Sequence, residues 1–94
     1  MRRRILERIR NAIRSANYDM THHAVEEMAE DKLGIFDVEA AVLNGQITGI
    51  ERNDPRGIKY IIEGVGIDQY TPVGVVGRFK ETGAFLIITV YEIT

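Results

Sequence analysis

The sequence predicts an α+β domain in which two to three N-terminal helices pack on one face of a four-stranded antiparallel β-sheet. Residues 2–43 carry apolar side chains at helical spacing. Residues 47–93 instead form short apolar runs separated by turn-forming residues. Helices followed by strands are typical of an α+β fold. A chain of 94 residues is large enough for one modest core, so 1–94 is predicted to be a single domain.

The first helix is predicted over residues 2–16, within a basic amphipathic segment, 1–17, that precedes a core of residues 18–94. Its apolar stripe is Ile5, Ile9, Ala12 and Ile13, with arginines between. The stripe predicts a helix that docks on the domain or forms a dimer. The alternative is a basic helix that binds RNA or an anionic membrane surface.

Two further helices follow a break in the apolar pattern. Thr21 is expected to cap the second helix, which runs to about Lys32, because a threonine hydroxyl can accept from a free amide of the first turn. Asp37 is expected to cap the third helix, which runs through Leu43 to an Asn-Gly pair that ends it.

Four strands are predicted in the remainder of the chain, over residues 47–52, 58–65, 73–80 and 84–93. The last two are joined by a compact hairpin loop with Gly83 where a left-handed residue is needed.

Alternation along the last strand predicts which of its side chains meet the helices. Leu86, Ile88 and Val90 form a uniformly aliphatic face that suits packing against helices. That assignment leaves Thr89 and Tyr91 on the open face of the sheet.

Charge is segregated along the chain although the net charge is only −2. Residues 1–17 carry six arginines and one glutamate, whereas residues 18–51 carry one lysine and eight acids. A sequence pI of about 5.6 is not typical of an electrostatic nucleic-acid binder. The simplest explanation is that the basic helix lies near the acidic one, in this chain or in a partner.

Composition excludes several classes of site and location. The chain has no cysteine, which excludes disulfides, thiolate metal sites and thiol catalysis and is expected of a cytoplasmic protein. No window approaches the ~20 apolar residues of a membrane span, so no membrane association by a spanning helix is expected. No cofactor is expected.

His22 and His23 are the only histidines, and adjacent helical residues point roughly 100° apart. That spacing cannot chelate one metal ion, so no metal site is predicted. His23 is a candidate general acid or base because an imidazole titrates near neutral pH. The alternative is a structural histidine bonded to a backbone carbonyl.

Arg78 and Tyr91 complete the candidate chemistry. A guanidinium is suited to clamp a phosphate, and a phenol can donate to a phosphate or take part in proton transfer. The alternatives are an arginine that reaches solvent or pairs with an acid, and a half-buried aromatic residue of the sheet.

The order of several short motifs resembles the small bacterial and archaeal domain family DUF4258 over residues 18–92. The motifs are Tyr18, Thr21-x-His23-Ala24, Met28, Ile35-x-Asp37-Val38, Asn44-Gly45-x-Ile47, Gly57, Gly66, Val75-Val76, Arg78-Phe79 and Ile87-Ile88-Thr89-Val90-Tyr91-Glu92. That family is similar to RelE/ParE-like and BrnT-like toxins. The resemblance therefore implies a RelE-like fold, an antitoxin protein as partner, and cleavage of mRNA without a metal.

On this hypothesis His23, Arg78 and Tyr91 are the catalytic residues, and Thr89 and Lys80 bind the substrate. Where the family pattern often has an arginine after the methionine of the second helix, this chain has Met28-Ala29-Glu30-Asp31, and acids oppose a phosphate-binding surface. The alternative function is a non-catalytic protein-interaction module that forms a homodimer or binds an antitoxin-like partner. A sensor of a small molecule or nucleotide is a third hypothesis.

Overall fold

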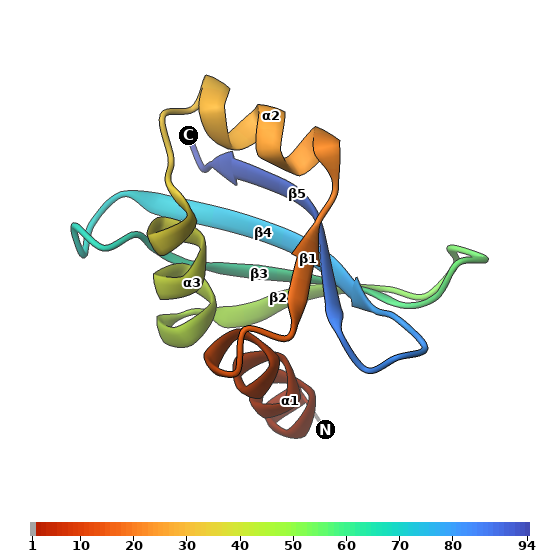
Figure 1. Ribbon diagram of the computed structural model, residues 1–94. Coiled ribbons are helices and arrows are strands. Elements are labelled where there is room, and N and C mark those ends of the chain that lie inside the picture. The colour runs from red at the N-terminus through yellow and green to blue at the C-terminus, as the bar shows by residue number, and fades with distance from the viewer. Residues whose placement is uncertain (1) are drawn as a thin grey trace.

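The computed structural model describes residues 2–94, which form three helices and five strands (Figure 1). The helices are α1 (Arg2–Arg14), α2 (His22–Glu30) and α3 (Ile35–Asn44). The strands are β1 (Tyr18–Met20), β2 (Gln46–Glu51), β3 (Lys59–Val65), β4 (Pro72–Phe79) and β5 (Phe85–Glu92). The α+β class is confirmed.

The sheet has five strands in the order β1-β5-β4-β3-β2, and β1 runs parallel to β5 while the other neighbours are antiparallel. The four predicted strands are present and pair antiparallel, but the prediction of a four-stranded antiparallel sheet was wrong because it missed β1. Residues Tyr18–Met20 are too few to show an alternating pattern, and they pair with residues Phe85, Leu86 and Ile87 at the other end of the chain. Only the tertiary structure makes this segment a strand.

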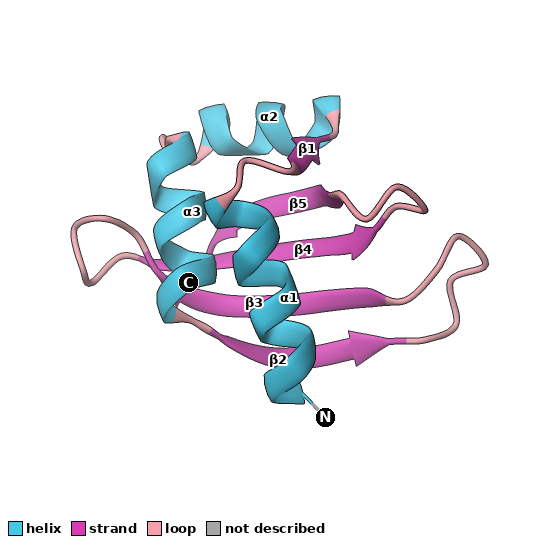
Figure 2. Ribbon diagram, turned by 60° about the horizontal axis from the view of Figure 1, so that its bottom comes forward, coloured by secondary structure: helices cyan, strands magenta, loops and turns pink. Residues whose placement is uncertain are grey.

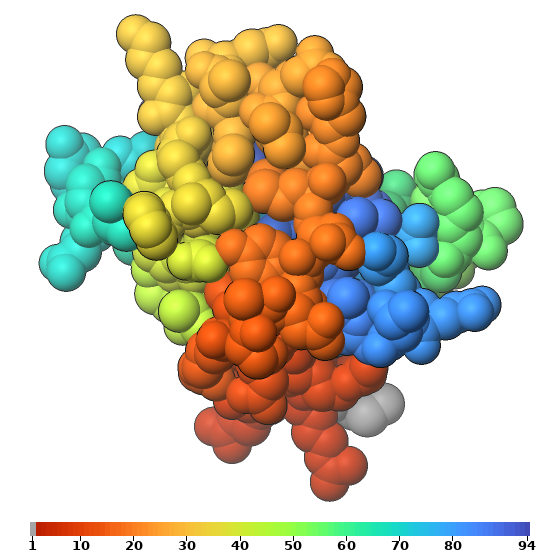
Figure 3. Space-filling model, in the orientation of Figure 1, coloured from red at the N-terminus to blue at the C-terminus, as the bar shows by residue number. Residues whose placement is uncertain are grey.

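The helices leave one face of the sheet uncovered. Figure 2 shows α1 and α3 lying across the same face, while α2 lies along the edge formed by β5 and β1. Side chains of α1, α3 and the inner sheet face build the core, which includes Ile9, Ile13, Val38, Val42, Ile62, Val73, Val75, Phe85, Ile87 and Val90. The loops after β2 and after β3 project from opposite ends of the molecule (Figure 3).

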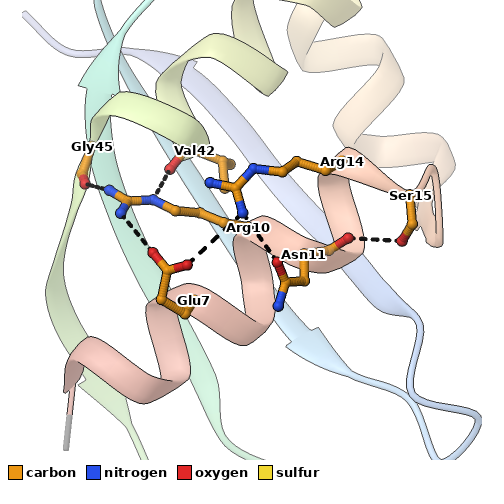
Figure 4. Close-up of polar contacts among 7 residues, drawn as sticks. All are labelled: Glu7, Arg10, Asn11, Arg14, Ser15, Val42 and Gly45. Carbon is orange, nitrogen blue, oxygen red and sulfur yellow. Dashed lines mark hydrogen bonds and ion pairs between the residues drawn. The ribbon is translucent and has the colours of Figure 1, made fainter.

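The apolar stripe of α1 is used within the chain. Ile9, Ala12 and Ile13 are buried and Ile5 packs against the core, which agrees with the prediction of a docked helix. Charge segregation predicted that the basic helix lies near the acidic one, in this chain or in a partner. Within this chain, the polar contacts of α1 do not reach α2. Arg10 instead donates to two carbonyls at the C-terminal end of α3 (Figure 4).

These two bonds join oppositely polarised groups. The Arg10 Nη2 lies 2.7 Å from the Gly45 oxygen and its Nε lies 3.3 Å from the Val42 oxygen. The last carbonyls of a helix have no partner within the helix and carry its negative dipole end. The guanidinium therefore fixes α1 across α3.

One predicted helix cap is confirmed and the other is wrong. The Thr21 hydroxyl accepts from the Ala24 amide at 3.1 Å and caps α2. The third helix begins earlier than predicted, because Gly34 is its capping residue. Asp37 lies in the first turn, where its carboxylate accepts from the Gly34 amide at 2.9 Å.

A β-bulge changes which side chains of β5 are buried. The pairing with β4 shifts between Val76 and Gly77, so that Ile88 is an extra residue in β5. Phe85, Ile87 and Val90 are consequently buried, and the predicted buried set of Leu86, Ile88 and Val90 is wrong for its first two members. Alternation cannot predict this because one inserted residue exchanges the two faces of a strand.

Candidate functional site

The uncovered sheet surface, which we call the open face, is formed by side chains that alternate with the buried ones. Val73 and Val75 point into the core, so Val76 and Arg78 of β4 point outward. Thr89 pairs with Val76 and Tyr91 pairs with Gly74, which places both on the same face. Four of the candidate side chains, Arg78, Lys80, Thr89 and Tyr91, therefore belong to this side of the sheet or to its border.

The centre of the open face is aliphatic. Ile61, Val76, Leu86 and Ile88 are each half-buried there, and the pairing places Ile61 beside Val76. The exposed face of an antiparallel sheet is normally polar, so an aliphatic centre is unusual for a surface that meets only water. An apolar centre with charged surroundings is the usual composition of a protein–protein interface.

Tyr91 lies flat across a glycine of the neighbouring strand. Its ring occupies the position that a Cβ at Gly74 would take, so a larger residue there would collide with it. Burial, followed by the nearby negative charge of Glu63, raises the pKa of the Tyr91 hydroxyl above its ordinary value. The phenol therefore keeps its proton at neutral pH and can act as a donor.

The two ends of the open face differ in charge. Glu63 pairs with Gly74 at the end that holds Tyr91, whereas Arg78 pairs with Leu86 at the opposite end. Neither Glu63 nor Arg78 has an ion-pair partner within residues 2–94. The aliphatic centre thus lies between one uncompensated anion and one uncompensated cation.

Lys80 is engaged differently from the prediction that it binds substrate. Its Nζ lies 2.6 Å from an Asp19 carboxylate oxygen, an ion pair that joins the end of β4 to β1 across β5. An exposed pair of this kind contributes little to stability. It does neutralise a charge that a phosphate would otherwise meet.

The two histidines lie on α2, at the sheet edge. His22 is 90% exposed and its Nε2 lies 2.9 Å from Glu26, while His23 is 68% exposed and its Nε2 lies 3.3 Å from Glu27. No hydrogen bond or ion pair in residues 2–94 joins His23 to Arg78 or Tyr91. The contacts in the structure therefore do not unite the three predicted catalytic side chains.

The acidic residues of α2 have a structural use that the sequence did not reveal. The Glu27 Oε1 accepts from the Val90 amide at 3.1 Å, and the Asp31 Oδ2 accepts from the Glu92 amide at 2.8 Å. Beyond the short β1, these two carboxylates take the place of a neighbouring strand along β5. The acidic stretch thus satisfies the sheet edge, which would otherwise present free amides.

Three hollows in the structure lie beside α1, and none was anticipated from the sequence. The largest has a volume of about 670 Å³ and is lined by Arg2, Arg4, Ile5, Ile50, Arg52, Ile58 and Tyr60. Arg2 and Arg3 line a second of about 410 Å³, and Arg8 lines a third of about 250 Å³. Their only sequence signal was the excess of arginines in the first helix.

The structure also bears on metal and membrane association. Within residues 2–94, no three histidine, aspartate or glutamate side chains gather where they could hold one metal ion. None of the described helices combines the length and apolar character needed to cross a bilayer.

Comparison with known protein families gives a match over most of the chain. Residues 20–92, which are most of the chain and exclude α1, match the model of the family DUF4258, described as a domain of unknown function. No curated protein and no solved structure matches the chain.

Proposed function

The chain belongs to the DUF4258 family, and we propose that it is a non-catalytic interaction module that forms a homodimer through the open face of its sheet. The observation that carries this proposal is the aliphatic centre that α1 and α3 leave uncovered, with Glu63 at one end and Arg78 at the other. Burying half-exposed aliphatic side chains between two copies contributes roughly 25 cal/mol per Å² of apolar area.

The charge pattern favours a second copy as the occupant. In a two-fold dimer the same patch meets itself, so each residue contacts the symmetry-related position of its partner. A two-fold axis near Val76 places the Glu63 end of one copy over the Arg78 end of the other. Both uncompensated charges then find a partner, and the aliphatic centres meet.

Charge reversal tests this arrangement by sedimentation equilibrium. Arg78→Glu alone and Glu63→Arg alone should each weaken self-association by at least about tenfold, because each homodimer would contain two like-charge contacts. An equimolar mixture of the two variants should recover a dimer, since each mixed pair would contain one original and one reversed ion pair. Arg14→Glu, a charge reversal on α1, should leave the dimer unchanged.

Two results would refute the homodimer. One is a mixture that stays monomeric while both variants are folded by circular dichroism. The other is dissociation by Phe36→Ser with no effect of Arg78→Glu, because Phe36 is 66% exposed on α3 and would then mark a different interface. If the wild-type protein is a monomer and binds an antitoxin-like protein, the homodimer is also refuted, and that protein is the partner of the open face.

We propose metal-independent mRNA cleavage, with an antitoxin as partner, as the second candidate function. The family resemblance implies it, and the placement of Arg78, Thr89 and Tyr91 on one uncovered face supports it. Arg78 would clamp the phosphate, Tyr91 would protonate the leaving 5′-oxygen, and His23 would act as the base on the ribose 2′-hydroxyl. Substrate binding would have to displace Lys80 from Asp19.

Induced expression in bacteria tests the ribonuclease directly. The readouts are growth and the integrity of total mRNA for wild type, His23→Ala and Arg78→Ala. Arrest with cleaved transcripts, relieved by either substitution, would support it. Normal growth with intact transcripts at good expression would refute it for those substrates. His23→Ala should fold normally because the side chain is largely exposed and its polar contact is an ion pair with Glu27.

A further inference from the structure

We propose that the largest hollow beside α1, lined by seven residues of α1, β2, β3 and the connecting loop, is a binding site for a nucleoside 5′-phosphate, free or at the end of an RNA strand. We call it the arginine pocket. Its volume of about 670 Å³ lies within the range of small-molecule sites. It lies beside α1, away from the residues that pair across the open face, so it stands independently of the proposed dimer.

The walls of the arginine pocket are apolar. Ile5, Ile50 and Ile58 are half-buried and pack against the core, and together they offer aliphatic surfaces for a flat ring. Tyr60 is 7% exposed, and its hydroxyl makes no hydrogen bond within residues 2–94. Every fully buried side-chain nitrogen or oxygen in the described chain has a hydrogen-bond partner. The Tyr60 hydroxyl has none, so it must be in contact with solvent, where it can bond to the edge of a base.

The rim of the pocket is cationic. Arg2, Arg4 and Arg52 line it, and none forms an ion pair with an acid in the described chain. The only acid of α1, Glu7, is already bound to Arg10 and Arg14. Three guanidinium groups around one opening therefore carry positive charge that the protein itself does not neutralise.

The combination of rim and walls favours a phosphate monoester over other anions. A phosphate monoester carries close to two negative charges and several acceptor oxygens, which suits more than one guanidinium. A fatty acid carries a single charge and has no group for the Tyr60 hydroxyl. A nucleotide supplies both the dianion and a flat body with polar edges, and enzymes that hold a base in a pocket place it between aromatic or apolar side chains and bond its edge.

The arginine pocket joins two parts of the chain. Arg2, Arg4 and Ile5 precede residues 20–92, which match the family model, whereas Ile50, Arg52, Ile58 and Tyr60 lie within them. The pocket is thus built where α1 crosses the matched part of the chain, and it is expected in relatives that carry a similar helix.

Calorimetry with the full chain at an ionic strength of about 0.15 M, where charges are screened over about 8 Å, tests the proposal. AMP should bind, whereas adenosine and inorganic phosphate should each bind at least about tenfold more weakly, because each lacks half of the recognised chemistry. Arg4→Gln and Arg52→Gln should each lower the affinity for AMP about tenfold. Arg3→Gln has the same charge change in the same helical turn but lines the neighbouring hollow, and it should change the affinity less than about twofold.

A second variant keeps the test independent of charge. Ile58→Trp should narrow the pocket at its apolar wall, lower the affinity for AMP at least about tenfold and leave the weak binding of inorganic phosphate. A 5′-phosphorylated RNA oligonucleotide that binds more tightly than its 5′-hydroxyl form would place the site at a strand end, and equal binding of the two, weaker than AMP, would assign it to the free nucleotide. Equal affinity for AMP and adenosine, equal losses in Arg3→Gln and Arg4→Gln, or tighter binding of decanoate than of AMP would each overturn the proposal.

Discussion

The carboxylate of Glu27 accepts a hydrogen bond from the backbone amide of Val90, 3.1 Å away, although 63 residues separate them in the sequence. The backbone of β1 pairs with the first part of β5. Further along β5, the side-chain carboxylates of Glu27 and Asp31 accept from its amides instead. A helix laid along an edge strand is one of the ways in which proteins prevent unwanted strand pairing. Two acids of this region, Glu27 in α2 and Asp31 at its C-cap, therefore have a structural role at the sheet edge.

Replacing Glu27 should be costly. Glu27→Ala leaves the Val90 amide without its partner, and we expect a loss of about 2 kcal/mol in the free energy of unfolding, measured with urea. Glu26→Ala is the matched control, since Glu26 is 59% exposed and pairs with the exposed His22, and it should cost less than about 0.5 kcal/mol. Equal losses in the two variants would show that the edge bond contributes nothing.

The contact between Gly74 and Tyr91 predicts a non-additive pair of substitutions. Gly74→Ala adds a Cβ where the Tyr91 ring lies, so it should destabilise the protein by about 1–3 kcal/mol. In a Tyr91→Ala background the same change should be close to neutral. Chemical denaturation of the four proteins of this cycle measures the difference, and an unchanged cost in both backgrounds would contradict the contact.

Tyr18 should make stability depend on alkaline pH. Burial, then the hydrogen bond to Glu39 at 2.6 Å and its charge, raise the pKa of Tyr18 to about 12. Folding therefore favours the protonated phenol, because the unfolded pKa is about 10. This contribution is fully present below pH about 10 and is lost as the pH rises towards about 12.

Comparing Tyr18→Phe with wild type isolates that contribution. Below pH about 10 the variant should be less stable by about 1 kcal/mol, and the difference should shrink as the pH approaches about 12. Tyr70→Phe is the control because Tyr70 is 78% exposed, and its curve should follow that of wild type. A difference between Tyr18→Phe and wild type that stays constant to pH about 12 would exclude the assignment.

The end of α1 offers a stabilising substitution. Ala16 has φ +55, and the Asn17 amide bonds to the Ala12 oxygen at 2.8 Å, which is the hydrogen bond of a Schellman motif. Glycine adopts this left-handed conformation without the steric cost of a Cβ. Ala16→Gly should therefore raise the unfolding free energy by about 1 kcal/mol. Asn11→Gly, within the exposed side of α1, should lower it by a similar amount, and the same sign for both would refute the explanation.

Features with local causes could be predicted from the sequence. Thr21 caps α2 because its hydroxyl meets an amide only three residues away, and Gly83 takes φ +92 in the hairpin as its turn requires. The three helices, the four longer strands and the docked side of α1 follow from periodicity alone.

Features that depend on distant partners could not be predicted. The strand at Tyr18–Met20 exists because Phe85–Ile87 lies beside it, and the bulge at Ile88 arises from pairing between β4 and β5. The same limit applies to the residues of the candidate site. Thr89 and Tyr91 lie on the open face as alternation along the last strand predicted, but the face of Arg78 depends on the pairing of β4 with β5. The engagement of His23 with Glu27 and of Lys80 with Asp19 depends on α2 and β1 reaching the sheet edge.

The parallel pairing of β1 with β5 also has a consequence for biosynthesis. During translation, α1, β1 and α2 leave the ribosome long before residues Phe85–Glu92 exist. Until then β1 has no strand to join, and the carboxylates of Glu27 and Asp31 have no amides to accept from. Contacts of such long sequence separation slow folding, so the nascent chain must wait for its last strand before the domain can close.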